Sequence, residues 1–129
     1  MGHRFTFEQA PQRVYWEITR ACDLACRHCR AEATPNADPA ELGPEEGKAL
    51  LDTITRFGAP YPHLVLTGGD PLKRADFFAL IDHATKVGLK LSVAPSATPL
   101  LTDEAVAAFA EHGVEAMSLS IDGSSSARH

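Results

Sequence analysis

Short apolar runs alternate with amphipathic segments along almost the whole chain, and this alternation constrains the fold more than any other feature. The runs cover residues 14–19, 63–67, 89–94 and 116–121, and each is mostly apolar without a break. Continuous runs of this length are typical of parallel strands that are buried on both faces. They predict a sheet whose strands all run in the same direction.

Three segments between the runs have helical periodicity. Each is followed by a glycine, at Gly58, Gly88 and Gly113, where helices commonly end. Pro44 and Thr102 are suited to the starts of the first and third segments. The apolar stripes comprise Leu50, Leu51, Ile54 and Phe57, then Phe77, Leu80, Ile81 and Ala84, then Val106, Phe109 and Ala110. The order of runs and helices predicts an α/β fold with right-handed crossovers.

The composition excludes several classes of protein. Hydrophobic residues make up 44% of the 129 residues and charged residues 22%, which are ordinary values for a globular domain. A net charge of −5 gives no general affinity for nucleic acid. No apolar run is long enough for a membrane span, and no secretory signal follows Met1. We therefore expect a cytoplasmic protein without a nucleic-acid or membrane partner.

The chain ends directly after the fourth apolar run. We expect residues 1–129 to be the N-terminal part of a single core domain, truncated after its fourth strand; a complete four-stranded domain is the alternative. A buried-type strand left at the edge of a sheet is a template for pairing with another molecule. On the truncated reading, the isolated chain should self-associate or be poorly soluble.

All three cysteines, Cys22, Cys26 and Cys29, lie in one short loop with the spacing C-x3-C-x2-C. An odd number of thiols this close together is a poor disulfide framework. Three thiolates can ligate three irons of a [4Fe–4S] cluster and leave the fourth iron open. The alternative is a zinc site with His28 as the fourth ligand, although its adjacency to Cys29 strains a compact tetrahedron.

Polar or glycine-rich clusters follow each of the four runs. In parallel α/β folds, functional sites form where the carboxyl ends of the strands meet, so we expect these clusters to lie together. They are the cysteine loop, Gly68-Gly69-Asp70-Pro71, Pro95-Ser96-Ala97-Thr98 and Asp122-Gly123-Ser124.

The cysteine loop resembles the signature of the radical S-adenosylmethionine (radical SAM) superfamily, with His28 at the usually aromatic position. Residues 16–22 are similar to the strand that leads into this loop in haem-biosynthesis-like members and members with SPASM extensions. The resemblance implies the first four units of a partial TIM-type (β/α)6 barrel. It also implies that Cys22, Cys26 and Cys29 hold a [4Fe–4S] cluster. Reductive cleavage of S-adenosylmethionine would then yield a 5′-deoxyadenosyl radical that abstracts hydrogen from an unknown substrate.

The resemblance also assigns ligand-binding residues. Gly68, Gly69 and Asp70 are similar to the family's Gly-Gly-Glu motif, which orients the methionine end, although Asp70 is shorter than the usual glutamate. The alternative reading is a plain turn in which Asp70 or Asp76 caps a helix. Further cofactor-binding candidates are His28, Ser96, Thr98, Ser120 and Asp122.

The implied partners are a low-potential electron donor and a peptide or a small molecule such as a tetrapyrrole precursor. Glu17 is expected either inside the barrel or facing solvent, and Tyr15 and Trp16 are expected in the core. Arg27 and Arg30 flank the last cysteine and either tune the cluster or are solvated. Two further alternatives remain at this point, namely a truncated fragment without catalysis and a zinc-stabilised binding module.

Overall fold

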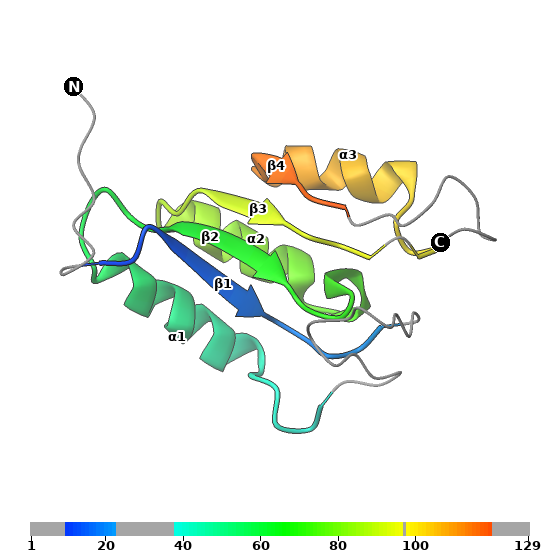
Figure 1. The fold of residues 1–129 in the computed structure, drawn as a ribbon, viewed down its shortest axis with the longest axis horizontal. Helices are drawn as coiled ribbons and strands as arrows, with labels where there is room; N and C mark the ends of the chain where they lie inside the picture. Colours follow the sequence, from blue (N-terminus) through cyan, green and yellow to red (C-terminus); the bar gives the residue numbers. More distant parts are fainter. Residues whose placement is uncertain (1–9, 23–37, 97, 120–129) are drawn as a thin grey trace.

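The computed structural model describes residues 10–22, 38–96 and 98–119, which form a four-stranded parallel sheet with helices between the strands (Figure 1). The strands lie side by side in chain order: β1 (Arg13–Glu17), β2 (His63–Thr67), β3 (Leu91–Val93) and β4 (Ala116–Met117). All three neighbouring pairs are parallel. The predicted α/β architecture is therefore confirmed.

The helices begin and end close to the predicted positions. They are α1 (Pro44–Thr55), α2 (Phe77–Lys86) and α3 (Asp103–Glu111), with a short 3-10 helix, η1 (Pro71–Lys73), before α2. Thr102 caps α3, because its hydroxyl accepts a hydrogen bond of 3.1 Å from the Ala105 N–H. Gly58, Gly88 and Gly113 each adopt a positive φ just beyond a helix.

The hydrophobic core lies on one face of the sheet. The side chains that point to this face alternate along β2 and β3, and all three helices contribute to the same cluster. The fully or almost fully buried members include Leu64, Leu66, Leu91 and Val93 from the strands, and Leu51, Ile54, Leu80, Ile81, Ala84 and Phe109 from the helices.

The opposite face of the sheet has no helix packed on it among the described residues, and it carries a pocket lined in part by Tyr15, Val65 and Ser92. The prediction that the strands are buried on both faces is therefore wrong for these residues. Tyr15 is 56% exposed rather than part of the core, and Glu17 is exposed. Trp16, which points to the helical face, is partly buried against the core as predicted.

Several predicted positions in the helices and in the last strand differ from the structure. Phe57 was expected on the apolar stripe of the first helix, but it lies beyond the end of α1 and is 47% exposed. Of the predicted apolar stripe of the third helix, Val106 is 41% exposed and Ala110 is also exposed, because Phe109 alone makes the buried core contact of α3. Both residues of β4 are exposed, and residues 120 and 121 lie outside the described part of the chain. Self-association through this edge strand stays a prediction.

The helices of the described segments are all too short or too polar to cross a membrane.

We expect Leu80→Ala to lower the free energy of unfolding by about 2–5 kcal/mol, because the side chain is fully buried and its loss leaves a cavity. Leu100→Ala is the matched control, since Leu100 is 41% exposed, and its cost should stay within about 0.5 kcal/mol. Urea unfolding followed by circular dichroism measures both. Equal losses in the two variants would contradict the assignment of the core.

Candidate cofactor site at the carboxyl edge of the sheet

Beyond the ends of β1 and β2 the two chains continue side by side. The Ile18 N–H donates to the Thr67 carbonyl at 2.9 Å, and the Gly69 N–H donates to the Thr19 carbonyl at 2.8 Å. The Asp70 N–H then donates to the Ala21 carbonyl at 2.7 Å. This extended pairing carries Cys22 to the carboxyl edge of the sheet, beside the glycine pair.

Gly68 and Gly69 permit this close approach. A Cβ on Gly68 would lie 2.4 Å from the Thr19 carbonyl oxygen, and a Cβ on Gly69 would lie 2.5 Å from the Ala21 carbonyl oxygen. Gly68 also has a φ of +150°, which side chains rarely allow. The neighbour that demands glycine at both positions is the segment leading to the first cysteine.

Cys22 joins three loops at this edge. It is buried, with 6% of its surface exposed, and its thiol donates to the Ser96 hydroxyl at 3.5 Å. Ser96 in turn donates to the Gly69 carbonyl at 2.7 Å. The structure therefore brings together Cys22, Gly69 and Ser96, which the sequence placed after three different strands. As a thiolate, Cys22 would be the soft ligand type that holds the irons of iron–sulfur clusters.

Asp70 is fully buried, and both of its carboxylate oxygens have partners. Oδ1 accepts from the Leu72 N–H at 3.1 Å, which caps η1, and Oδ2 accepts from the Thr98 hydroxyl at 2.8 Å. Asp70 therefore caps a helix, as the alternative reading of the sequence predicted. Asp76 stands at the start of α2 without a side-chain capping bond. Because Asp70 has no exposed surface, direct contact with a ligand needs a rearrangement of this loop.

Several predicted site residues lie outside the described part of the chain. They are Cys26, Cys29, His28, Ser120 and Asp122, together with Arg27 and Arg30. Their roles stay predictions. Within residues 10–22, 38–96 and 98–119, no group of three or more histidine, cysteine or acidic side chains is arranged to hold a metal ion. Cys22 is the ligand candidate whose surroundings are described.

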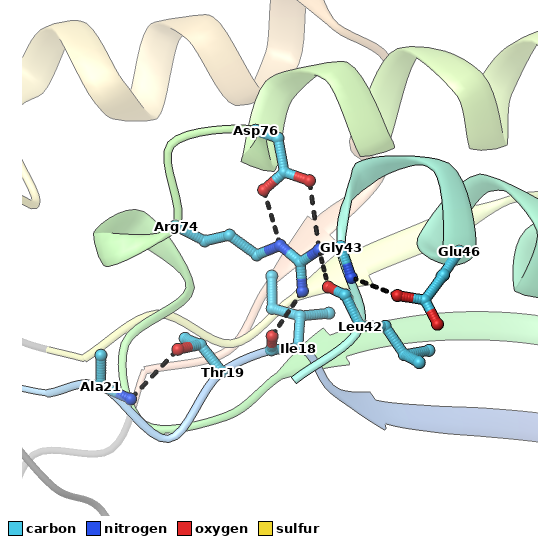
Figure 2. A network of polar contacts seen from close by, with 8 residues as sticks. All are labelled: Ile18, Thr19, Ala21, Leu42, Gly43, Glu46, Arg74 and Asp76. Carbon is cyan, nitrogen blue, oxygen red and sulfur yellow. Dashed lines mark hydrogen bonds and ion pairs between the residues drawn. The ribbon is translucent and has the colours of Figure 1, made fainter. Parts of the chain in front are cut away.

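Arg74 is a buried residue of this region that sequence reasoning missed (Figure 2). Its guanidinium donates to the Ile18 carbonyl at 2.6 Å, to the Leu42 carbonyl at 2.5 Å and to both carboxylate oxygens of Asp76 at 2.6 and 3.1 Å. It also lies 5.6 Å from the centre of the Trp16 ring. The sequence feature that could have drawn attention to Arg74 is an arginine soon after the glycine pair with an aspartate two positions later. That pattern does not reveal that the arginine is buried.

Comparison with known proteins shows that the model of the radical SAM superfamily matches residues 16–129. The chain belongs to the radical SAM superfamily. Members of this superfamily bind a [4Fe–4S] cluster and S-adenosylmethionine, and their core domain is a partial TIM barrel. The superfamily resemblance and the two cofactors expected from the sequence are therefore confirmed.

The chain is similar to several proteins named as heme synthases or maturases. It is 46% identical to an AdoMet-dependent heme synthase from Oleidesulfovibrio alaskensis over 90% of this chain, and 38% identical to one from Methanosarcina barkeri over 93%. It is 35% identical to the mycofactocin maturase MftC of Mycolicibacterium smegmatis over 88% of this chain. The matched regions span 29%, 34% and 28% of these three relatives, respectively.

We expect Gly69→Ala to lower the free energy of unfolding by about 1–3 kcal/mol, because its Cβ would overlap the Ala21 and Arg20 carbonyls. Gly43→Ala is the control: Gly43 has a φ of −72°, its Cβ would meet nothing closer than 3.7 Å, and the cost should be about 1 kcal/mol or less. Chemical denaturation of the two variants tests the comparison. A Gly69→Ala variant as stable as Gly43→Ala would show that the two loops can separate freely.

Proposed function

We propose that the protein is a radical SAM enzyme in which Cys22, Cys26 and Cys29 hold the cluster and residues 68–70 orient the methionine end of S-adenosylmethionine. The observation that carries the proposal is the contact chain from the Cys22 thiol through Ser96 to Gly69. It joins the first cysteine to the motif implied to orient the methionine end, at the edge where parallel α/β folds bind ligands. Family membership favours an iron–sulfur cluster over zinc.

When bound, the cluster and S-adenosylmethionine would supply a one-electron cleavage that gives methionine and a 5′-deoxyadenosyl radical, which takes a hydrogen atom from the substrate. The chain's own residues position these groups. Pairing of residues 18–21 with 67–70 fixes where Cys22 emerges from the sheet. Ser96 holds the Gly69 carbonyl, so the backbone presented by the glycine pair is oriented before a ligand arrives.

Asp70 is assigned a supporting role at the methionine end. Its carboxylate is inaccessible in the structure, so we assign it two indirect roles. It fixes the shape of the loop, and its negative charge favours the ammonium group of the methionine end. Thr98 holds that carboxylate at 2.8 Å, which gives this hydroxyl a part in the same arrangement. Ser96, Ser120 and Asp122, with His28, remain candidates for contacts to the nucleoside.

The substrate is proposed to be a tetrapyrrole precursor. The heme synthases reported above are 38% and 46% identical to the chain, compared with 36% for a relative named PqqA peptide cyclase from Rhodopseudomonas palustris. A peptide is the second candidate, because that cyclase is named for a peptide. A low-potential donor supplies the electron. We place the reaction in the cytoplasm, where the cysteines remain reduced. We assign residues 1–129 to the N-terminal part of one core domain.

The cluster assignment predicts that anaerobic reconstitution with iron and sulfide gives a brown protein, and that alanine at Cys22, Cys26 or Cys29 abolishes bound iron. Visible absorption with iron and sulfide analysis measures this. Ser118→Ala is the control, since Ser118 is exposed just after β4, and this variant should keep its iron.

Full iron in two of the three cysteine variants would overturn the assignment, and a colourless protein holding zinc would favour the binding module. Iron without 5′-deoxyadenosine in a dithionite assay would favour a fragment that lacks catalysis.

The role of Asp70 predicts that Asp70→Asn weakens S-adenosylmethionine binding about ten- to a hundredfold, since it removes a charge while keeping the shape of the side chain. Iron content should be unchanged. Isothermal titration of the reconstituted protein measures the affinity, and Asp103→Asn, at the exposed start of α3, is the matched control. An unchanged dissociation constant would reduce Asp70 to the cap of η1.

A further inference from the structure

We propose that Arg74 is a positioning residue that closes the base of the cysteine-bearing loop and thereby controls how firmly a bound cluster is retained. The proposal deepens the function proposed above and rests on it. Figure 2 shows the arrangement: the guanidinium lies between the end of β1, the segment that precedes α1 and the start of α2. None of these contacts involves a cysteine, so Arg74 would act through the backbone.

The two carbonyls that Arg74 binds flank the cysteine loop. Ile18 precedes it and Leu42 follows it, and all three cysteines lie within residues 19–41. One terminal nitrogen, Nη1, binds the first carbonyl, and the other, Nη2, binds the second. Because the guanidinium is planar and rigid, both ends of the loop are held in one fixed relation.

The site is built to keep the guanidinium in place. The Arg74 side chain is only 3% exposed, and Asp76 binds it at Nε and Nη2, which compensates its buried charge. The Trp16 ring lies beside the guanidinium on the β1 side. An ion pair with Asp76 alone would not need the further hydrogen bonds to the Ile18 and Leu42 carbonyls, which are far apart in the sequence. We infer the loop-closing role of Arg74 from those two hydrogen bonds.

Other contacts do not make the same connection. The bonds from Gly69 and Asp70 hold only the entrance to the loop, at Thr19 and Ala21. Arg20 and Asp38 approach to 3.6 Å across the loop, but their side chains are 48% and 38% exposed, so water screens the pair. Arg74 is thus the buried connection, within the described residues, between the entrance and the exit.

The test compares Arg74→Met with Leu80→Ala, a core variant that destabilises the domain but removes none of the hydrogen bonds to the Ile18 and Leu42 carbonyls. Both are reconstituted with iron and sulfide, and iron release to a chelator is followed at a temperature where circular dichroism shows both to be folded. We expect release at least tenfold faster from Arg74→Met than from Leu80→Ala. Arg74→Lys should fall between Arg74→Met and the unmodified protein, because an ammonium group lacks the fork that reaches both carbonyls. If Arg74→Met does not fold, Arg74→Lys is compared with Leu80→Ala, and faster release is again expected.

A second measurement needs no cluster and separates this proposal from the function above. Trypsin cleavage of the apoprotein after Arg27 and Arg30 should be faster in the Arg74 variants than in Leu80→Ala. Equal iron release and equal cleavage rates would overturn the proposal and make Arg74 an ordinary buried ion pair. Failure of the unmodified protein to bind iron would overturn the proposed function, whereas faster cleavage in the Arg74 variants would still support closure of the loop.

Discussion

The close pairing of residues 18–21 with 67–70 is the contact on which the candidate site depends. It prolongs the β1–β2 ladder past the ends of both strands, through hydrogen bonds of 2.7–2.9 Å. Backbones this close leave no room for a side chain at either glycine. The position of Cys22 at the edge of the sheet depends on Gly68 and Gly69, which belong to a different loop. A Cβ on either glycine would push apart the two segments that continue β1 and β2.

Buried and partly buried polar groups around this pairing each have a structural role as well as a proposed functional one. Asp70 caps η1 and binds Thr98, Ser96 connects Cys22 to Gly69, and Arg74 binds backbone on both sides of the cysteine loop. A buried polar group without a partner is costly, so these side chains constrain one another. Substitutions in this cluster will therefore combine losses of stability with losses of ligand binding, and matched controls are needed to separate the two.

Much of the fold could be predicted because its signals are local. Helix starts and stops at Pro44, Thr102, Gly58, Gly88 and Gly113 depend on backbone preferences that act within a few residues. Parallel pairing followed from the alternation of apolar runs and helices. Burial was predicted less well. Tyr15 is exposed because only one face of the sheet carries helices in the described segments, and Phe57 is exposed because it lies beyond the end of α1. Val106 is exposed because Phe109 makes the core contact of α3.

The sequence by itself determined the order of elements, the cysteine spacing and the family resemblance, since each is a pattern along the chain. The tertiary structure decided which of those residues meet. Nothing local to the glycine pair reveals that its tight neighbour is the Thr19–Ala21 backbone, or that Asp70 faces Thr98 instead of open space. Arg74 is the clearest case, because its four partners come from three separate segments of the chain. A side chain's burial and partners depend on contacts between distant segments, which exist only once the sheet and helices have packed.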